Sequence, residues 1–169
     1  MAIILIGGGA RSGKSSLALT LARKQGTRLA FIATAEAHDE EMRTRIEHHR
    51  EDRGAAFETL EAPLDLACAV KRSSGKFDAI IVDCLTLWLS NLLLDGTRDI
   101  EAETQAMLTA ANTSGALVLL VTNEVGCGIV PENDLARRFR DLSGRMNQEA
   151  AAAALEVYWM VFGCPVKVK

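Results

Sequence analysis

The sequence has no excess of basic residues. Its 169 residues include 19 Lys and Arg against 22 Asp and Glu, so the formal net charge is -3. A chain with this balance has no overall positive field that would attract nucleic acid or an anionic membrane. We therefore expect neither among its partners, and any positive potential has to be local.

Paired cysteines and a targeting segment are also missing. Cys68, Cys84, Cys127 and Cys164 are far apart and form no Cys-x-x-Cys motif, which argues against a zinc site or a redox dithiol. Reduced thiols in a cytoplasmic protein are expected. The apolar stretch 3–6 is short and has no basic segment before it, so we expect a core strand rather than a secretion signal or a membrane span.

The strongest positive signal is a phosphate-binding loop. The sequence Gly-Gly-Ala-Arg-Ser-Gly-Lys-Ser at 8–15 fits Gly-x4-Gly-Lys-Ser and directly follows the apolar run 3–6. Glycines let backbone N–H groups turn toward phosphate oxygens, Lys14 can reach the β and γ phosphates, and the Ser15 hydroxyl can bind Mg²⁺. The motif predicts nucleoside triphosphate binding. The residues concerned are Gly8, Gly9, Ala10, Arg11, Ser12, Gly13, Lys14 and Ser15.

Apolar runs alternate with stretches of helical spacing along the whole chain. This order predicts an α/β fold with a mainly parallel sheet covered on both faces. The length suits one domain, 1–169, and we find no internal repeat or linker. Strands are expected at 3–6, 29–33, 79–82, 116–121 and 157–162, with a short edge strand at 165–169; helices are expected at 14–24, 39–50, 64–72, 85–94, 100–112 and 133–153.

Asp83 ends the apolar run 79–82, where a second ligand for Mg²⁺ is expected. An acid at the end of a strand beside a phosphate loop can share the metal with Ser15. A residue in this position is also a common helix N-cap. The upstream loop favours the metal site.

The segment 40–53 combines histidine with several arginines. At helical spacing, Met42, Ile46 and His49 share a face, whereas His48 is turned about 100° away. Arginines around an inward imidazole can hold phosphate oxygens and help to keep the ring neutral and nucleophilic. Two interpretations remain open here: a nucleophilic His49, or a solvated Glu/Arg-rich helix with a structural histidine.

A third segment, 121–133, joins a strand end to a helix through a loop with two glycines and a proline. Ligands bind at the carboxyl edge of a parallel sheet, so this loop can belong to an active site. On physical grounds a plain connector is equally acceptable.

Together these segments resemble the bifunctional adenosylcobinamide kinase / adenosylcobinamide-phosphate guanylyltransferase family of cobalamin biosynthesis. The phosphate loop is common to many NTPases, whereas the other motifs are more particular. The matching stretches are 8–15, Ile-Ala-Thr at 32–34, Arg-Ile-x-x-His-Arg-x-x-Arg at 45–53, Asp83, Asn-Leu-Leu at 91–93, Thr-Asn-Glu-Val-Gly-x-Gly-Ile-Val-Pro-Glu-Asn at 122–133, and Phe-Arg-Asp at 139–141 through Gly144 to Asn-Gln at 147–148.

The resemblance implies a P-loop NTPase-like three-layer α/β/α fold with a C-terminal antiparallel edge hairpin. It implies phosphorylation of adenosylcobinamide by ATP or GTP, followed by transfer of GMP from GTP to adenosylcobinamide phosphate through His49, with Mg²⁺ and as a homotrimer. Further nucleotide-contacting positions implied by the family are Ala33, Thr34, Ala35, Arg50, Glu51, Asp52, Arg53, Glu61 and Asp83. Gly54 and Phe57 depart from the Pro and Trp common in the family, so the resemblance does not extend to the contacts of the loop after the nucleophile.

Three other functions compete with this assignment. A small-molecule kinase would share the phosphate loop and use His49 only structurally. A GTP-binding regulatory protein would need Asn-Lys-x-Asp, but Glu124 follows Asn123 and Gly126 stands at the Asp position. A dinucleotide-binding oxidoreductase would need glycine where Ser12 stands.

Overall fold

The computed structural model describes residues 2–36, 40, 43–44 and 54–169. These residues contain a seven-stranded sheet with the order β3-β2-β4-β5-β1-β6-β7. The strands are β1 (Ile3–Gly8), β2 (Leu29–Ala33), β3 (Phe57–Glu61), β4 (Ala79–Asp83), β5 (Leu117–Val121), β6 (Glu156–Val161) and β7 (Cys164–Lys167). The first six strands pair in parallel and β7 pairs antiparallel with β6, which confirms the predicted sheet and edge hairpin.

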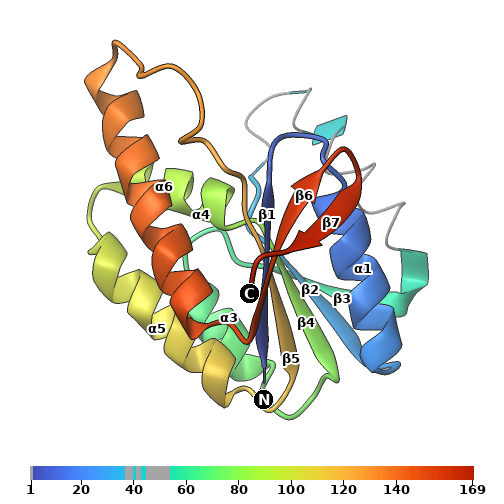
Figure 1. The fold of residues 1–169 in the computed structure, drawn as a ribbon. Helices are drawn as coiled ribbons and strands as arrows, with labels where there is room; N and C mark the ends of the chain where they lie inside the picture. Colours follow the sequence, from blue (N-terminus) through green and yellow to red (C-terminus); the bar gives the residue numbers. More distant parts are fainter. Residues whose placement is uncertain (1, 37–39, 41–42, 45–53) are drawn as a thin grey trace.

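The helices cover both faces of the sheet (Figure 1). The described helices are α1 (Lys14–Gln25), α3 (Leu66–Arg72), α4 (Leu85–Asp95), α5 (Ile100–Thr113) and α6 (Asp134–Ala153), with a 3-10 turn η1 (Gly54–Ala56). Helices α3, α4, α5 and α6 enclose one apolar core against the sheet, and α1 packs in a second core on the opposite face. None of the helices in the described part combines the length and apolar character needed to cross a bilayer.

Burial explains which strands the sequence revealed. Every residue of β1 is buried, and β4 is buried except for Asp83, so these central strands are continuous apolar runs. Strand β3 was not predicted. It lies at the edge of the sheet, and Phe57 is its only buried residue, so its sequence carries no apolar run.

Most of the predicted helix 39–50, including His49, lies outside the described residues. Glu40, Arg43 and Thr44 are described and are helical, and the Thr44 hydroxyl donates to the Glu40 carbonyl at 3.0 Å.

Because β1, β2, β4 and β5 are parallel, their carboxyl ends meet at one edge of the sheet. The phosphate loop leaves β1 at this edge, and the loop between β5 and α6 rises beyond it (Figure 1). Asn133 caps α6, since its Oδ1 accepts from the Ala136 N–H at 3.1 Å. The predicted site segments that the structure describes therefore gather at one edge.

Candidate active site

The phosphate loop, residues 8–15, links β1 to α1, and its shape requires two of its glycines. Gly8 has φ 147° and Gly13 has φ 92°, values that L side chains rarely adopt. A Cβ on Gly8 would also lie 2.8 Å from the Met160 carbonyl oxygen and 2.9 Å from Ser12 Oγ. Glycine at these two positions lets the backbone turn tightly between strand and helix.

Lys14 begins α1 and is only 7% exposed. Its Nζ donates to the Gly9 carbonyl oxygen at 2.5 Å and lies 3.5 Å from Ser12 Oγ. The ammonium group is thus held within the loop, at the positive end of a helix, where phosphate groups are favoured.

Ser15 and Asp83 meet across the edge of the sheet. The Ser15 hydroxyl donates to Asp83 Oδ2 at 3.1 Å, although the two residues are 68 positions apart in sequence. Asp83 is the last residue of β4, and Ser15 is in the first turn of α1. The sequence predicted that these two side chains would come together, and the structure places them in direct contact.

A hydroxyl and a carboxylate are hard oxygen donors of the kind that Mg²⁺ prefers. Mg²⁺ in nucleotide sites is usually held by one or two protein groups together with phosphate oxygens and water. The Ser15–Asp83 pair fits this pattern. No cluster of three or more His, Cys, Asp or Glu side chains suited to a metal occurs among the described residues.

The ends of β2 and β3 bring further predicted residues to the edge of the sheet that carries Asp83. Ala33 ends β2 and is in register with Asp83 on β4 and with Glu61 on β3. Ala35 follows shortly after β2 and is half-buried. Ala33, Glu61 and Asp83 therefore share one edge, on the β2 side of the phosphate loop.

Thr34 is fully buried, and its hydroxyl is hydrogen-bonded to Cys84. It donates to the Cys84 carbonyl oxygen at 2.8 Å and accepts from the Cys84 N–H at 2.8 Å. The Thr34 N–H donates to the Asp83 carbonyl at 3.2 Å. Asn91 Nδ2 donates to the Thr34 carbonyl at 2.8 Å, which fixes this contact from α4. Thr34 thus holds the backbone that carries the Asp83 carboxylate.

Cys84 is buried beside this contact, and burial together with the neighbouring Asp83 charge raises the pKa of its thiol to about 11. The thiol is therefore protonated at neutral pH and is a poor nucleophile. Asn123 Nδ2 lies 3.9 Å from its sulfur.

A second polar network fixes the start of the loop between β5 and α6. The Thr122 hydroxyl donates to Asn147 Oδ1 at 2.7 Å, and the Asn123 N–H donates to Thr86 Oγ1 at 2.8 Å. The Glu124 N–H donates to the Gly8 carbonyl at 3.2 Å, which joins this loop to the phosphate loop. Thr86 carried no sequence signal, because an isolated threonine in an apolar helix belongs to no motif.

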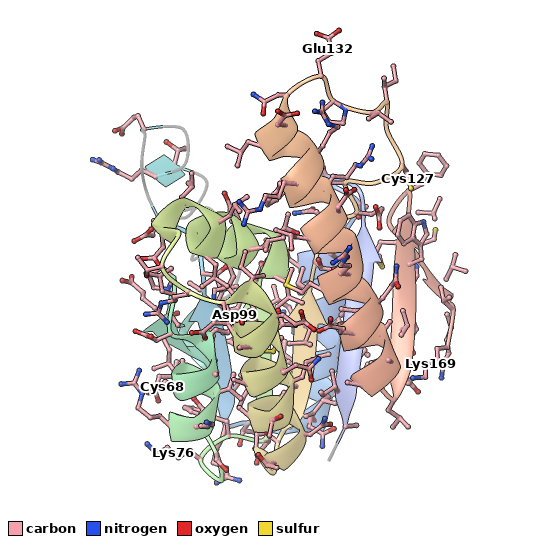
Figure 2. The ribbon with its side chains drawn as sticks, turned by 90° about the vertical axis from the view of Figure 1, so that its left-hand side faces the viewer. Cys68, Lys76, Asp99, Cys127, Glu132 and Lys169 are labelled. Atoms are coloured by element: carbon pink, nitrogen blue, oxygen red, sulfur yellow. The ribbon has the colours of Figure 1, made fainter. Side chains whose placement is uncertain are left out.

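The rest of this loop extends beyond the sheet, with Glu132 at its far end (Figure 2). Ile129 is 97% exposed and Val130 is 59% exposed. Arg137 donates to the carbonyl oxygens of Pro131 and Glu132 at 2.9 and 2.5 Å, so the end of the loop is attached to α6. The segment is an anchored loop that exposes two apolar side chains, Ile129 and Val130, shortly before its far end.

His49 and the neighbouring predicted residues Arg50, Glu51, Asp52 and Arg53 lie outside the described residues. Their assignment to the nucleotide site stays a prediction. The described ends of their segment, at Glu36 and Gly54, adjoin β2 and β3.

The sheet order, the phosphate loop and the strand-end acid define a nucleotide-binding domain of the P-loop NTPase class. Two solved structures share the fold. A RadB recombinase matches with a TM-score of 0.53 at 15% identity, covering 94% of this chain and 73% of that chain. A type III secretion system ATPase from pathogenic bacteria matches with a TM-score of 0.56 at 11% identity, covering 95% and 51%.

Sequence similarity identifies the family more closely. The family described as cobinamide kinase / cobinamide phosphate guanyltransferase matches residues 4–168, and the chain belongs to this family. A bifunctional adenosylcobalamin biosynthesis protein CobP from Pseudomonas aeruginosa is 43% identical over 98% of this chain and 96% of the relative. The CobU protein of the same description from Escherichia coli is 42% identical, with 99% of each chain covered. The resemblance inferred from the motifs is confirmed.

Proposed function

We propose that the protein phosphorylates adenosylcobinamide and then transfers GMP from GTP to the product, giving adenosylcobinamide-GDP and pyrophosphate. The observation that supports this most directly is the Ser15–Asp83 contact beneath an intact phosphate loop, in a chain of the cobinamide kinase / cobinamide phosphate guanyltransferase family. ATP or GTP serves the first reaction, and GTP serves the second.

In the kinase reaction, the aminopropanol hydroxyl of adenosylcobinamide forms a bond to the γ-phosphorus while the bond to the β–γ bridging oxygen breaks. The proton of the hydroxyl is released, and the nucleoside diphosphate leaves. Backbone N–H groups of residues 8–15 and the Lys14 ammonium group hold the phosphates and neutralise charge on the leaving group. Ser15 and Asp83 would hold Mg²⁺, which supplies positive charge to the phosphate oxygens when bound.

In the guanylyl transfer, a neutral ring nitrogen of His49 forms a bond to the α-phosphorus of GTP and pyrophosphate leaves. A phosphate oxygen of adenosylcobinamide phosphate then displaces the histidine. Arg50 and Arg53 would hold phosphate oxygens during both steps, with Glu51 and Asp52 beside them. Ala33, Ala35 and Glu61 complete the nucleotide site at the strand ends, and the buried Thr34 holds the backbone beneath it.

The same proposal covers the organisation of the protein. The whole chain, 1–169, forms one catalytic domain, works as a homotrimer and is cytoplasmic. Sedimentation measurements on the purified protein test the trimer, and fractionation of cells tests the location.

Labelling with GTP that carries radioactive phosphorus at the α position tests the guanylyl transfer. The wild-type protein should acquire a label that is labile in acid and stable in alkali, as expected for a phosphoramidate. His48→Ala should still be labelled, whereas His49→Ala should not, although it should retain much of the phosphorylation of adenosylcobinamide. Labelling should weaken as pH falls below an imidazole pKa of about 6.5, because a proton then occupies the attacking lone pair.

Mass spectrometry of the modified peptide identifies the residue. A label mapped to His48 or Lys14, or a labelled His49→Ala protein, would show that His49 is not the nucleophile. A wild-type protein that phosphorylates adenosylcobinamide but never carries GMP would be a kinase only.

A further inference from the structure

The tip of the β6–β7 hairpin exposes a large aromatic ring. The two-residue turn is formed by Phe162 and Gly163, which have φ 51° and 82°. Positive φ at both central residues is typical of the type I′ turn, where Asn and Gly are the usual residues. Phe162 is 99% exposed. An exposed phenyl ring at a position that disfavours phenylalanine suggests a role beyond folding.

This turn lies against the phosphate loop. A Cβ placed on Gly13 would be 3.4 Å from Gly163 Cα and 3.5 Å from Met160 Cε. Met160 on β6 also limits the space at Gly8, as described above. The tip of the hairpin accordingly lies beside the beginning of α1 (Figure 1).

The direction in which a triphosphate lies across the phosphate loop determines which end of the nucleotide faces this turn. The Ser15–Asp83 pair is on the β4 side of the phosphate loop, whereas β6 and β7 flank β1 on the opposite side. In the kinase reaction, the γ-phosphate must be near the pair that would hold Mg²⁺. The nucleoside end then extends in the opposite direction, toward the turn.

We propose that the Phe162 ring stacks on the purine base of the phosphoryl donor during the kinase reaction. Aromatic side chains stack on any nucleobase because every base has a π-face, so the ring can stack on either adenine or guanine. The inference rests on the proposed function, because it requires a nucleoside triphosphate with its γ end at Ser15 and Asp83.

Guanylyl transfer should depend less on this ring. In the sequence, His49 lies between β2 and β3, and these two strands are at the edge of the sheet opposite to β6 and β7. The α-phosphorus of GTP has to reach His49 in that reaction, so the nucleotide adopts a different pose. Phe162 therefore distinguishes the two activities.

Phe162→Asn tests the stacking, because Asn tolerates positive φ and removes the ring. We expect the KM for ATP in the kinase assay to rise about 5- to 20-fold, the lower part of the range for base–aromatic stacking. The inhibition constant of inorganic tripolyphosphate, which has no base, should stay within twofold of the wild-type value.

Phe162→Trp, which keeps an aromatic ring at this position, should have a KM for ATP as low as that of the wild type. Leu155→Asn, which changes an exposed apolar residue just before β6, is the matched control and should leave both constants unchanged.

Several results would overturn the stacking. One is an unchanged KM for ATP in Phe162→Asn. Another is an equal rise of the KM for ATP and of the inhibition constant of tripolyphosphate, because the ring would then act on the shape of the phosphate loop and not on the base. A loss of subunit association in Phe162→Asn would make the ring a subunit contact. Labelling of His49 and kinase turnover at saturating ATP separate this inference from the proposed function: if both persist while the KM is unchanged, only the stacking is wrong.

Discussion

The Ser15 hydroxyl donates a hydrogen bond of 3.1 Å to Asp83 Oδ2, and this contact joins the start of α1 to the end of β4. Lys14, the preceding residue, holds its ammonium group at the Gly9 carbonyl. Lys14 and Ser15 are neighbours in α1, and Asp83 ends β4. These three residues therefore position the Lys14 ammonium group and the proposed Mg²⁺, the positive charges that would act on the triphosphate.

Asp83→Asn should weaken Mg²⁺ binding in both reactions, because it removes the negative charge of the proposed metal ligand while keeping its size. We expect the Mg²⁺ concentration for half-maximal activity to rise, and kcat/KM to fall by at least about tenfold, or about 1.4 kcal/mol. Titration of both activities with MgCl₂ measures this. Asp65→Asn, an exposed acid before α3, is the control and should behave like the wild type. Normal Mg²⁺ dependence in Asp83→Asn would rule out the metal site.

Lys14→Ala should impair both activities, because the same ammonium group neutralises the phosphates in each. Removal of one preorganised donor to developing charge costs about 10²- to 10³-fold in rate. Steady-state kinetics of both reactions measure the loss. Lys24→Ala, on the exposed part of the same helix, should have wild-type rates. If Lys14→Ala loses only one activity, the two reactions do not share this site.

The sequence was sufficient to predict the central sheet and the contact between Ser15 and Asp83. The buried parallel strands are continuous apolar runs, and an acid at the end of β4 must lie at the same edge as a loop that leaves β1. Edge strand β3 was missed because solvent covers most of its side chains.

The contacts that support the site could not be predicted in this way. Thr34 hydrogen-bonds to Cys84, 50 residues away, and Thr122 to Asn147, 25 residues away. Each contact depends on the relative placement of two elements to within a fraction of an ångström. Hydrophobic periodicity does not determine positions at that precision, although several of these residues belong to family motifs.

The ion pair between Arg28 and Asp78 predicts a pH dependence of stability. Hydrogen bonds from the Arg28 side chain and backbone lower the pKa of the Asp78 carboxyl. A depressed pKa in the folded state stabilises the protein above the unfolded pKa of about 3.9, and this stabilisation is lost as pH falls through the folded pKa.

Asp78→Asn should therefore unfold at lower urea concentration than the wild type at neutral pH. The difference between the two midpoints should shrink as the pH falls below about 4. Urea titrations followed by circular dichroism at several pH values measure this, with Asp141→Asn on the exposed surface of α6 as the comparison. A difference that does not change with pH would mean that the charge of Asp78 does not contribute.

Thr34→Val should alter the proposed Mg²⁺ site, although Thr34 is not one of its proposed ligands. Valine keeps the shape of threonine but leaves the buried N–H and carbonyl of Cys84 without the Thr34 hydroxyl, which should lower the free energy of unfolding by about 1–3 kcal/mol. Because this hydroxyl holds the backbone next to Asp83, we also expect a severalfold higher Mg²⁺ requirement for both activities. Thr34→Ser, which keeps the hydroxyl, should have the Mg²⁺ requirement of the wild type.

Thr104→Val is the matched control: Thr104 is also buried, and its hydroxyl donates to the Ile100 carbonyl at 2.7 Å in α5. That variant should lose stability with an unchanged Mg²⁺ requirement. If Thr34→Val also loses stability with an unchanged Mg²⁺ requirement, Thr34 stabilises the fold and does not position Asp83.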